Sequence, residues 1–241
     1  MIIGGLEKLS LLDYPDHLAA IIFTQGCNFR CHFCYNPMLV WPQSGTDEKN
    51  KKEKGFPPLS TEDLFLFLRE RFGRLEGVVI TGGEPTLHPD LPQFIKKIKE
   101  IGYLVKLDTN GTNPKMLADL IKAELIDYIA MDIKAPLEKY ESVVGVKVSC
   151  NNLAKSVKII MGSGLPYEFR TTVVPGLLAK ADFRRMGEQI KGADKWYLQS
   201  FKSDTDLVDP GYKAKPAYTK VQMKEFAAIG QKYVKLCQVR G

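Results

Sequence analysis

Short apolar runs rich in β-branched residues alternate with longer stretches of helical periodicity along the chain. Strands that alternate with helices usually form parallel βαβ units with right-handed crossovers. The pattern predicts an α/β protein, built either as an open doubly wound sheet or as a full or partial β/α barrel. The six runs that we expect to form strands are residues 18–24, 78–81, 103–108, 128–132, 167–174 and 196–201.

Local signals mark where several helices begin and end. Ser60 and Asp63 resemble a capping box ahead of the apolar run 64–68. Gly102 follows the periodic stretch 94–101 as a stop signal. Asn113 and Pro114 provide an N-cap and a first helical residue before residues 116–125. Further helices are predicted over residues 153–161, 183–190 and 221–234.

Composition excludes several classes of protein. With 44% hydrophobic and 26% charged residues, the chain matches an ordinary soluble globular protein rather than a disordered one. The longest apolar run, 18–23, is far shorter than the roughly 20 residues of a membrane helix. The formal net charge of +6 is not the clustered charge of a nucleic-acid binder. We therefore expect a cytoplasmic protein that binds neither nucleic acid nor membrane.

The length of 241 residues suits one α/β domain, and we expect a single domain over residues 1–241. Residues 41–58 are rich in charge and poor in apolar side chains. This composition is typical of a mobile surface loop.

Polar and glycine-rich segments follow the predicted strands one after another. Residues 27–34 follow the first strand, 82–85 the second and 108–111 the third. Asp132 and Lys134 close the fourth strand. Because the carboxyl ends of parallel strands open onto one face, we expect these segments to build one site.

Three cysteines dominate the chemistry of the sequence. Cys27, Cys31 and Cys34 lie within eight residues, a spacing that favours metal binding in a reducing compartment over disulfides. Three thiolates on a four-iron cluster leave one iron free to bind another ligand. The alternatives are a thioredoxin-like redox pair, or a zinc site completed by His32, His88, Cys150 or Cys237. Otherwise Cys150 and Cys237 are ordinary thiols.

Each of the other strand ends allows a binding role and a structural one. Gly82 and Gly83 let backbone groups approach a ligand beside the Glu84 carboxylate, or they form a tight turn. Asp108 and Asn110 bind ribose hydroxyls or hold their loop in shape. Asp132 and Lys134 are either ligand contacts or an ion pair. Tyr35 is either a neighbour of the adenine or a packed ring. Arg170 is either a substrate contact or a surface residue.

The cysteine pattern CxxxCxxC, with Phe33 before the third cysteine, resembles that of the radical S-adenosylmethionine superfamily. The resemblance implies a partial (β/α)6 barrel of parallel strands. It implies a 4Fe-4S cluster with three cysteine ligands, whose fourth iron is chelated by the amino and carboxylate groups of S-adenosylmethionine. No catalytic residue beyond the cluster is implied. The residues implied to bind the cofactor are Phe33, Tyr35, Gly82, Gly83, Glu84, Asp108, Asn110, Asp132 and Lys134.

Further segments resemble the activating proteins of anaerobic ribonucleoside-triphosphate reductases, which are related to the pyruvate formate-lyase activator. Those segments are residues 3–6, 10–15, 23–26, 107–111 and 170–176. The resemblance implies reductive cleavage of S-adenosylmethionine to methionine and a 5'-deoxyadenosyl radical, which generates a glycyl radical on a partner enzyme. It also implies a low-potential donor such as flavodoxin or ferredoxin. Tyr35 and Asp16 stand where these activases usually carry His and Gly.

Two other functions remain open on the sequence. The same cofactor chemistry could act on a small molecule such as a deazapurine precursor. Alternatively, the cysteines could belong to a non-catalytic module that binds metal or transfers electrons.

Overall fold

The computed structural model describes residues 1–41 and 59–240, which form two compact units. Unit 1 comprises residues 1–28, 38–109 and 115–129, and unit 2 comprises residues 29–37, 110–114 and 130–241. The charged segment expected to be a mobile loop lies almost entirely outside the described residues. In the described part of the chain, the strands are β1 (Ile3–Ser10), β2 (Ala19–Thr24), β3 (Gly77–Gly82), β4 (Leu104–Thr109), β5 (Tyr128–Asp132), β6 (Tyr167–Val173), β7 (Lys195–Ser200) and β8 (Leu236–Arg240).

Helices separate most of these strands along the chain. The α-helices are α1 (Pro37–Val40), α2 (Thr61–Arg71), α3 (Leu91–Ile101), α4 (Pro114–Lys122), α5 (Tyr140–Val144), α6 (Cys150–Met161), α7 (Lys180–Gln189) and α8 (Lys220–Gly230). Short 3-10 helices cover Pro85–Leu87, Leu137–Lys139 and Pro210–Tyr212. The strands follow chain order in one mostly parallel sheet, which confirms the predicted α/β class.

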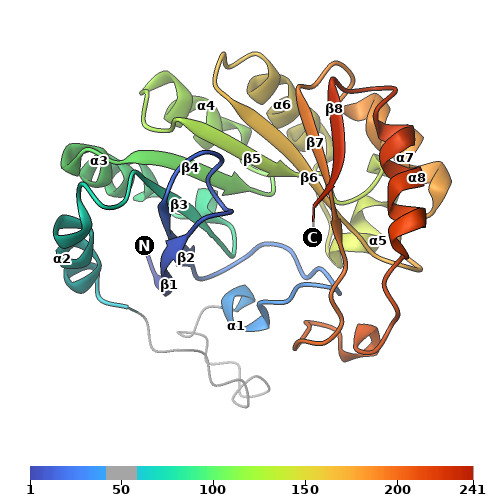
Figure 1. Cartoon of the computed structure of the whole chain (residues 1–241), viewed down its shortest axis with the longest axis horizontal. Coiled ribbons are helices and arrows are strands. Elements are labelled where there is room, and N and C mark those ends of the chain that lie inside the picture. The colour runs from blue at the N-terminus through green and yellow to red at the C-terminus, as the bar shows by residue number, and fades with distance from the viewer. Residues whose placement is uncertain (42–58, 241) are drawn as a thin grey trace. The chain divides into compact units, whose positions relative to one another are not determined.

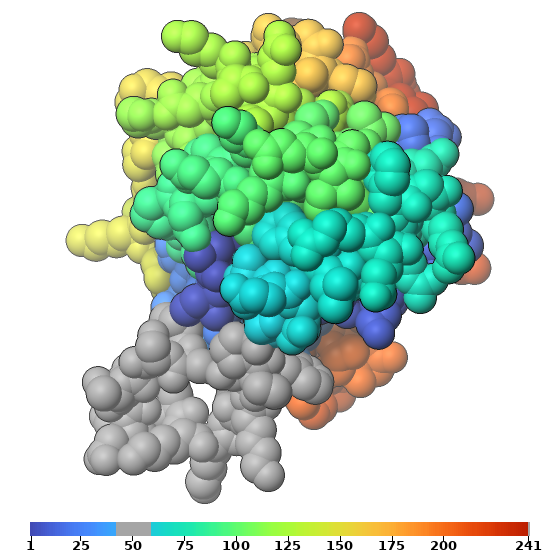
Figure 2. Space-filling model, turned by 90° about the vertical axis from the view of Figure 1, so that its left-hand side faces the viewer, coloured from blue at the N-terminus to red at the C-terminus, as the bar shows by residue number. Residues whose placement is uncertain are grey.

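Unit 1 is organised around parallel strands β2, β3 and β4. The register pairs Ile22 with Ile80 and Ile80 with Leu107, and all three side chains are fully buried. Helices α2 and α3 pack together through the rings of Phe65 and Phe94, whose centroids lie 5.4 Å apart. The two helices lie side by side on the surface of this unit (Figure 2). Burial of β-branched and aromatic side chains therefore stabilises this unit.

Unit 2 contains the parallel strands β6, β7 and β8, with α7 and α8 beside them (Figure 1). The rings of Phe183 and Phe226 stack with centroids 4.5 Å apart and join the two helices. The buried indole N–H of Trp196 donates to Thr171 Oγ1 at 2.9 Å. A buried polar group thereby keeps a partner inside the core.

The sequence located six strands, and the structure contains all six with small shifts at their ends. It also contains β1 and β8, which the apolar pattern did not reveal. Strand β1 pairs antiparallel with β2 and carries the exposed residues Glu7, Lys8 and Leu9, so its alternation is weak. Strand β8 has only five residues, of which Cys237 alone is buried.

The signals predicted at Ser60, Gly102 and Pro114 mark helix ends in the structure. The Ser60 side chain accepts a hydrogen bond from the Asp63 N–H at the start of α2. Gly102 ends α3 with a φ of 110°, a conformation that favours glycine. Pro114 is the first residue of α4. Among the residues described, no helix combines the length and the apolar character needed to cross a bilayer.

Candidate functional site

The turn after β3 in unit 1 is formed by glycines that pack against backbone. Gly82 has a φ of 111°, and a Cβ there would lie 2.5 Å from the Thr24 carbonyl oxygen. A Cβ on Gly83 would collide with the Gly26 carbonyl group. The Gly83 N–H donates to Thr24 O and the Glu84 N–H donates to Gly26 O, both at 2.8 Å. The sequence carries two glycines here because no side-chain atom fits between these segments.

Glu84 follows that turn and is completely buried. One carboxylate oxygen, Oε1, accepts hydrogen bonds from the Thr86 N–H at 3.1 Å and from the Thr109 hydroxyl at 2.7 Å. The carboxylate thus caps the 3-10 helix after β3 and joins it to the end of β4. Sequence reasoning expected a ligand contact from Glu84, and the structure adds a structural role.

Asp108 and Asn110 lie at the end of β4 but in different units. In unit 1, the Asp108 carboxylate is buried and accepts a hydrogen bond from Lys106 Nζ at 2.6 Å. In unit 2, Asn110 Oδ1 accepts hydrogen bonds from the Thr112 N–H at 3.0 Å and its hydroxyl at 2.7 Å. Asn110 therefore holds the turn in shape, one of the two roles that its sequence position allowed.

The three cysteines are divided between the units. Cys27 belongs to unit 1, where its N–H donates to Val40 O at 3.0 Å. Cys31 and Cys34 belong to unit 2, where the Cys34 N–H donates to Cys31 O at 3.0 Å and closes a turn. Within residues 1–41 and 59–240, no three Cys, His, Asp or Glu side chains are gathered in a group that could hold a metal ion. Their assignment as cluster ligands therefore rests on the chemistry and spacing of the thiols.

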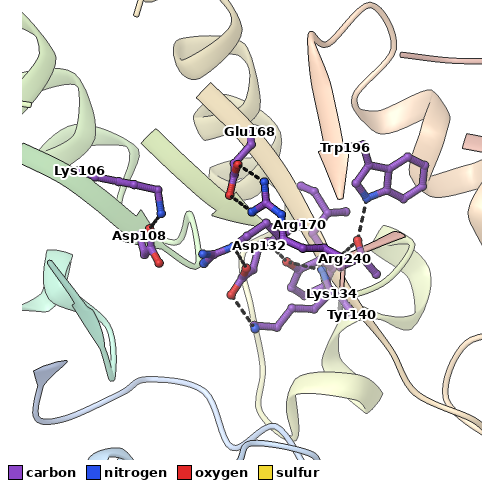
Figure 3. A network of polar contacts seen from close by, with 11 residues as sticks. Lys106, Asp108, Asp132, Lys134, Tyr140, Glu168, Arg170, Trp196 and Arg240 are labelled. Carbon is purple, nitrogen blue, oxygen red and sulfur yellow. Dashed lines mark hydrogen bonds and ion pairs between the residues drawn. The ribbon is translucent and has the colours of Figure 1, made fainter. Parts of the chain in front are cut away.

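A network of three charged side chains lies at the end of β5 in unit 2. Asp132 Oδ2 is 3.2 Å from Lys134 Nζ, and Asp132 Oδ1 is 3.0 Å from Arg170 Nε (Figure 3). All three side chains are mostly buried. Burial disfavours the ionised form of Asp132, but the two cations outweigh it and lower the Asp132 pKa to about 2. The network holds one carboxylate between two cations and leaves a net positive charge.

The Lys134 ammonium is close enough to the cysteine turn to influence it. Burial opposes its charge, yet the Asp132 carboxylate and then the Cys31 thiol raise its pKa above the ordinary value. The Cys34 thiol has a raised pKa because it is buried, while the Lys134 charge acts in the opposite direction. Lys134 Nζ also lies 5.8 Å from the Phe33 ring centroid. Lys134 is therefore surrounded by Cys31, Phe33, Cys34 and Asp132 in unit 2.

Two aromatic side chains complete this part of unit 2. The Tyr140 hydroxyl donates to Asp132 O and accepts from the Lys134 N–H, both at 3.3 Å. Tyr35 is hydrogen-bonded to the Thr172 side chain, and burial raises its pKa. Sequence reasoning missed Tyr140, since a tyrosine eight residues beyond a strand gives no local signal. It considered Arg170 as a substrate contact or a surface residue, but its side chain is largely buried and bonds to Asp132.

Three of the four residues considered for a zinc site, His32, Cys150 and Cys237, have other surroundings. His32 Nδ1 lies 3.3 Å from Asp209 Oδ2. The Cys150 Sγ contacts Leu137 O at 3.5 Å. Cys237 is buried, which raises its pKa to about 12 and keeps the thiol protonated at neutral pH. Burial thus disfavours the thiolate form of Cys237 that metal binding requires.

Comparison with known proteins agrees with the sequence and the fold. Residues 21–183 match the family model of the Radical SAM superfamily. A Methanocaldococcus jannaschii protein described as a "putative glycyl-radical enzyme activating enzyme" is 31% identical over 239 residues, which cover 97% of this chain and 93% of that protein. The pyruvate formate-lyase-activating enzyme of Clostridium pasteurianum is 30% identical over 193 residues, covering 78% of this chain and 76% of that enzyme.

Two further comparisons are less extensive. A probable GTP 3',8-cyclase of Saccharolobus solfataricus is 31% identical over 149 residues, covering 60% of this chain and 44% of that protein. The crystal structure of Streptococcus suis SuiB bound to S-adenosylmethionine superposes with a TM-score of 0.66 at 16% identity, covering 92% of this chain and 50% of SuiB, and shows the shared fold. From the family match and the similarity over nearly the whole chain, we conclude that the chain belongs to the radical S-adenosylmethionine superfamily.

Proposed function

We propose that this radical S-adenosylmethionine enzyme generates a glycyl radical on anaerobic ribonucleoside-triphosphate reductase. The observation that carries the activating function is the similarity to the Methanocaldococcus jannaschii protein, which extends over 97% of this chain. The choice of partner rests on the resemblance of segments such as 10–15 and 170–176 to the activators of that reductase. A flavodoxin or a ferredoxin supplies the electron.

Cys27, Cys31 and Cys34 hold a 4Fe-4S cluster in this proposal. The donor set fits, because thiolate sulfur is the preferred ligand of iron-sulfur clusters. The Lys134 ammonium beside the Cys31 and Cys34 thiols supports the assignment, since it stabilises a thiolate-ligated and therefore negative centre. When bound, this cluster supplies the electron that cleaves S-adenosylmethionine and so initiates removal of hydrogen from a glycine Cα.

The residues of this chain bind and orient the cofactor. Gly82 and Gly83 let backbone segments approach closely, and the buried Glu84 carboxylate beside them is suited to an ammonium. The Lys134 ammonium, held by Asp132, is suited to a carboxylate, and Asp108 and Asn110 are suited to hydroxyls. Phe33 and Tyr35 provide apolar surface for the nucleoside.

The second candidate function is radical chemistry on a small molecule. It is favoured by the 31% identity to the probable GTP 3',8-cyclase. That similarity covers 60% of this chain, which is less than the coverage by the activating enzymes. We therefore rank it second. Family membership also argues against a non-catalytic metal-binding module.

Anaerobic reconstitution with iron, sulfide and a reductant tests the proposal. Wild-type protein is expected to release 5'-deoxyadenosine from S-adenosylmethionine and to produce a glycine-centred doublet in the paramagnetic resonance spectrum of an added reductase. Cys31→Ser is expected to abolish both signals, whereas the matched control Cys150→Ser retains them. Cofactor cleavage without a doublet would favour the small-molecule reaction. Full activity of Cys31→Ser would refute the ligand assignment.

A further inference from the structure

The segment between β7 and α8, residues 201–219, has no role in the function described above. We call it the strap. Its ends are fixed within unit 2, because Phe201 and Leu207 are buried and the Tyr218 hydroxyl donates to Leu178 O at 2.8 Å. Between these points the chain crosses the turn that carries Cys31 and Cys34. The strap is thus an anchored segment that contacts Cys34 and the neighbouring His32.

Two backbone hydrogen bonds join the strap to the cysteine turn. The Val208 N–H donates to Cys34 O at 3.2 Å, and the Asp209 N–H donates to His32 O at 3.0 Å. Together with the bond from the Cys34 N–H to Cys31 O, they fix the backbone on both sides of Cys34 and on the carboxyl side of Cys31. Backbone bonds of this kind restrict the dihedral angles that set the separation of two thiols.

Side chains strengthen the same contact. Asp209 Oδ1 accepts from the Gly211 N–H at 2.8 Å, while Asp209 Oδ2 lies 3.3 Å from His32 Nδ1. The Tyr212 ring stacks on the His32 ring, with centroids 5.7 Å apart and planes 16° apart. Lys215 Nζ lies 3.6 Å from the Tyr212 centroid. The imidazole next to Cys31 is therefore held by a carboxylate and by an aromatic ring.

We propose that Asp209 and Tyr212 are positioning residues for the cluster, and that they act through His32 on the geometry and solvent exposure of the Cys31–Cys34 turn. This inference rests on the proposed function. Residues surrounding the ligands orient them, and their loss weakens metal sites by about 10- to 100-fold. Solvent exposure also changes the potential, because reduction makes the cluster more negative and water stabilises the more negative state.

The test compares four variants of the full chain after anaerobic reconstitution. Asp209→Asn keeps an oxygen for the Gly211 N–H but removes the charge facing His32, and Tyr212→Leu removes the stacking ring. Tyr212→Phe keeps the ring and serves as the conservative rescue. Asp206→Asn is the matched control, because Asp206 is paired with Lys213 in the same strap.

We expect Tyr212→Leu to lose iron to a chelator about tenfold faster than wild type, with a smaller increase for Asp209→Asn. We expect both variants to have a higher midpoint potential. Tyr212→Phe and Asp206→Asn should match wild type in both measurements. If Tyr212→Leu also lowers the melting temperature of the apo protein, a weakened fold would explain its faster iron release. The comparison of Asp209→Asn with Asp206→Asn then tests the positioning role.

Equal release rates and potentials in Asp209→Asn, Tyr212→Leu and wild type would overturn the positioning role. The proposed function would then survive, since wild type still binds its cluster. Wild-type protein that takes up no iron and sulfide would overturn the proposed function and this inference with it.

Discussion

The end of β3 in unit 1 and the end of β5 in unit 2 present their site residues by different physical means. At the end of β3, Gly82 and Gly83 lie against backbone atoms with no room for a Cβ. At the end of β5, Asp132, Lys134 and Arg170 form a charged network (Figure 3). Steric fit therefore limits which residues the end of β3 can carry, and charge balance limits which residues the end of β5 can carry.

The two mechanisms respond differently to change. A steric restriction depends on atom positions and is insensitive to pH, whereas an ion network loses its stabilisation when one member changes its protonation state. Each strand end can thus be perturbed by a change that leaves the other mechanism intact. Mutations that add an atom to β3 or remove a charge from β5 separate the two.

The largest effect is expected for Gly83→Ala in unit 1. A methyl group would meet the Gly26 carbonyl group, and it would lie 3.0 Å from the Leu39 carbonyl oxygen. Because neither partner is a flexible side chain, we expect a loss of about 3 kcal/mol in the free energy of unfolding, measured on the apo protein in urea.

Gly73→Ala is the control for that substitution. Gly73 has a positive φ of 79°, unlike Gly83, and nothing lies within 4 Å of the position that a Cβ would occupy there. It should lose only about 1 kcal/mol, the cost of the backbone conformation. A loss in Gly83→Ala no larger than the loss in Gly73→Ala would mean that close packing does not restrict the end of β3.

Asp132→Asn should have the next largest effect. Removing this carboxylate leaves Lys134 and Arg170 side by side without their shared counter-charge. We expect a loss of about 2 kcal/mol at pH 7, less than for a fully buried pair because these side chains retain some solvent contact. Asp119→Asn, in an exposed pair with Lys115, should lose about 0.5 kcal/mol or less.

The same variant gives a pH test of the charge mechanism. The Asp132 pKa is lowered from 3.8 to about 2 in the folded protein. A carboxylate whose pKa is lower in the folded than in the unfolded chain stabilises the fold fully at a pH above its unfolded pKa. That contribution is lost as the pH falls through its folded pKa. The stability difference between wild type and Asp132→Asn should therefore shrink between about pH 4 and pH 2. A constant difference over that range would contradict the charge mechanism.

Local signals allowed much of the fold to be predicted. The apolar runs located β2 to β7, since burial on both faces leaves continuous apolar residues. Ser60 and Gly102 marked helix ends because caps depend on residues that are close in sequence. Strand β1 was not predicted because its exposed residues weaken the alternation of apolar and polar positions.

The site was predictable in part for the same reason. Asp132 and Lys134 were recognised together because alternate residues of a strand share a face. The bond from Arg170 to Asp132 and the contact of Asp209 with His32 join residues 38 and 177 positions apart. Such contacts arise from tertiary packing and leave no trace in local spacing.

The smallest expected effect concerns Asp16, where backbone conformation can be tested without any collision. The His17 N–H donates to Tyr14 O at 3.1 Å, so residues 14–17 form a turn, and Asp16 has a φ of 66°. With Pro15 before it, Asp16 occupies the position of a type II turn that favours glycine.

Asp16→Gly should raise the free energy of unfolding by about 0.5 kcal/mol, because relief of the left-handed conformation exceeds the added entropy of the unfolded chain. Asp16→Ala should lower it, since alanine lacks the local hydrogen bonding that helps aspartate tolerate this conformation. Urea unfolding of the two variants beside wild type provides the measurement. If Asp16→Gly is the less stable of the two variants, backbone conformation does not limit stability at this turn, and the steric restriction in unit 1 is confined to the packed glycines after β3.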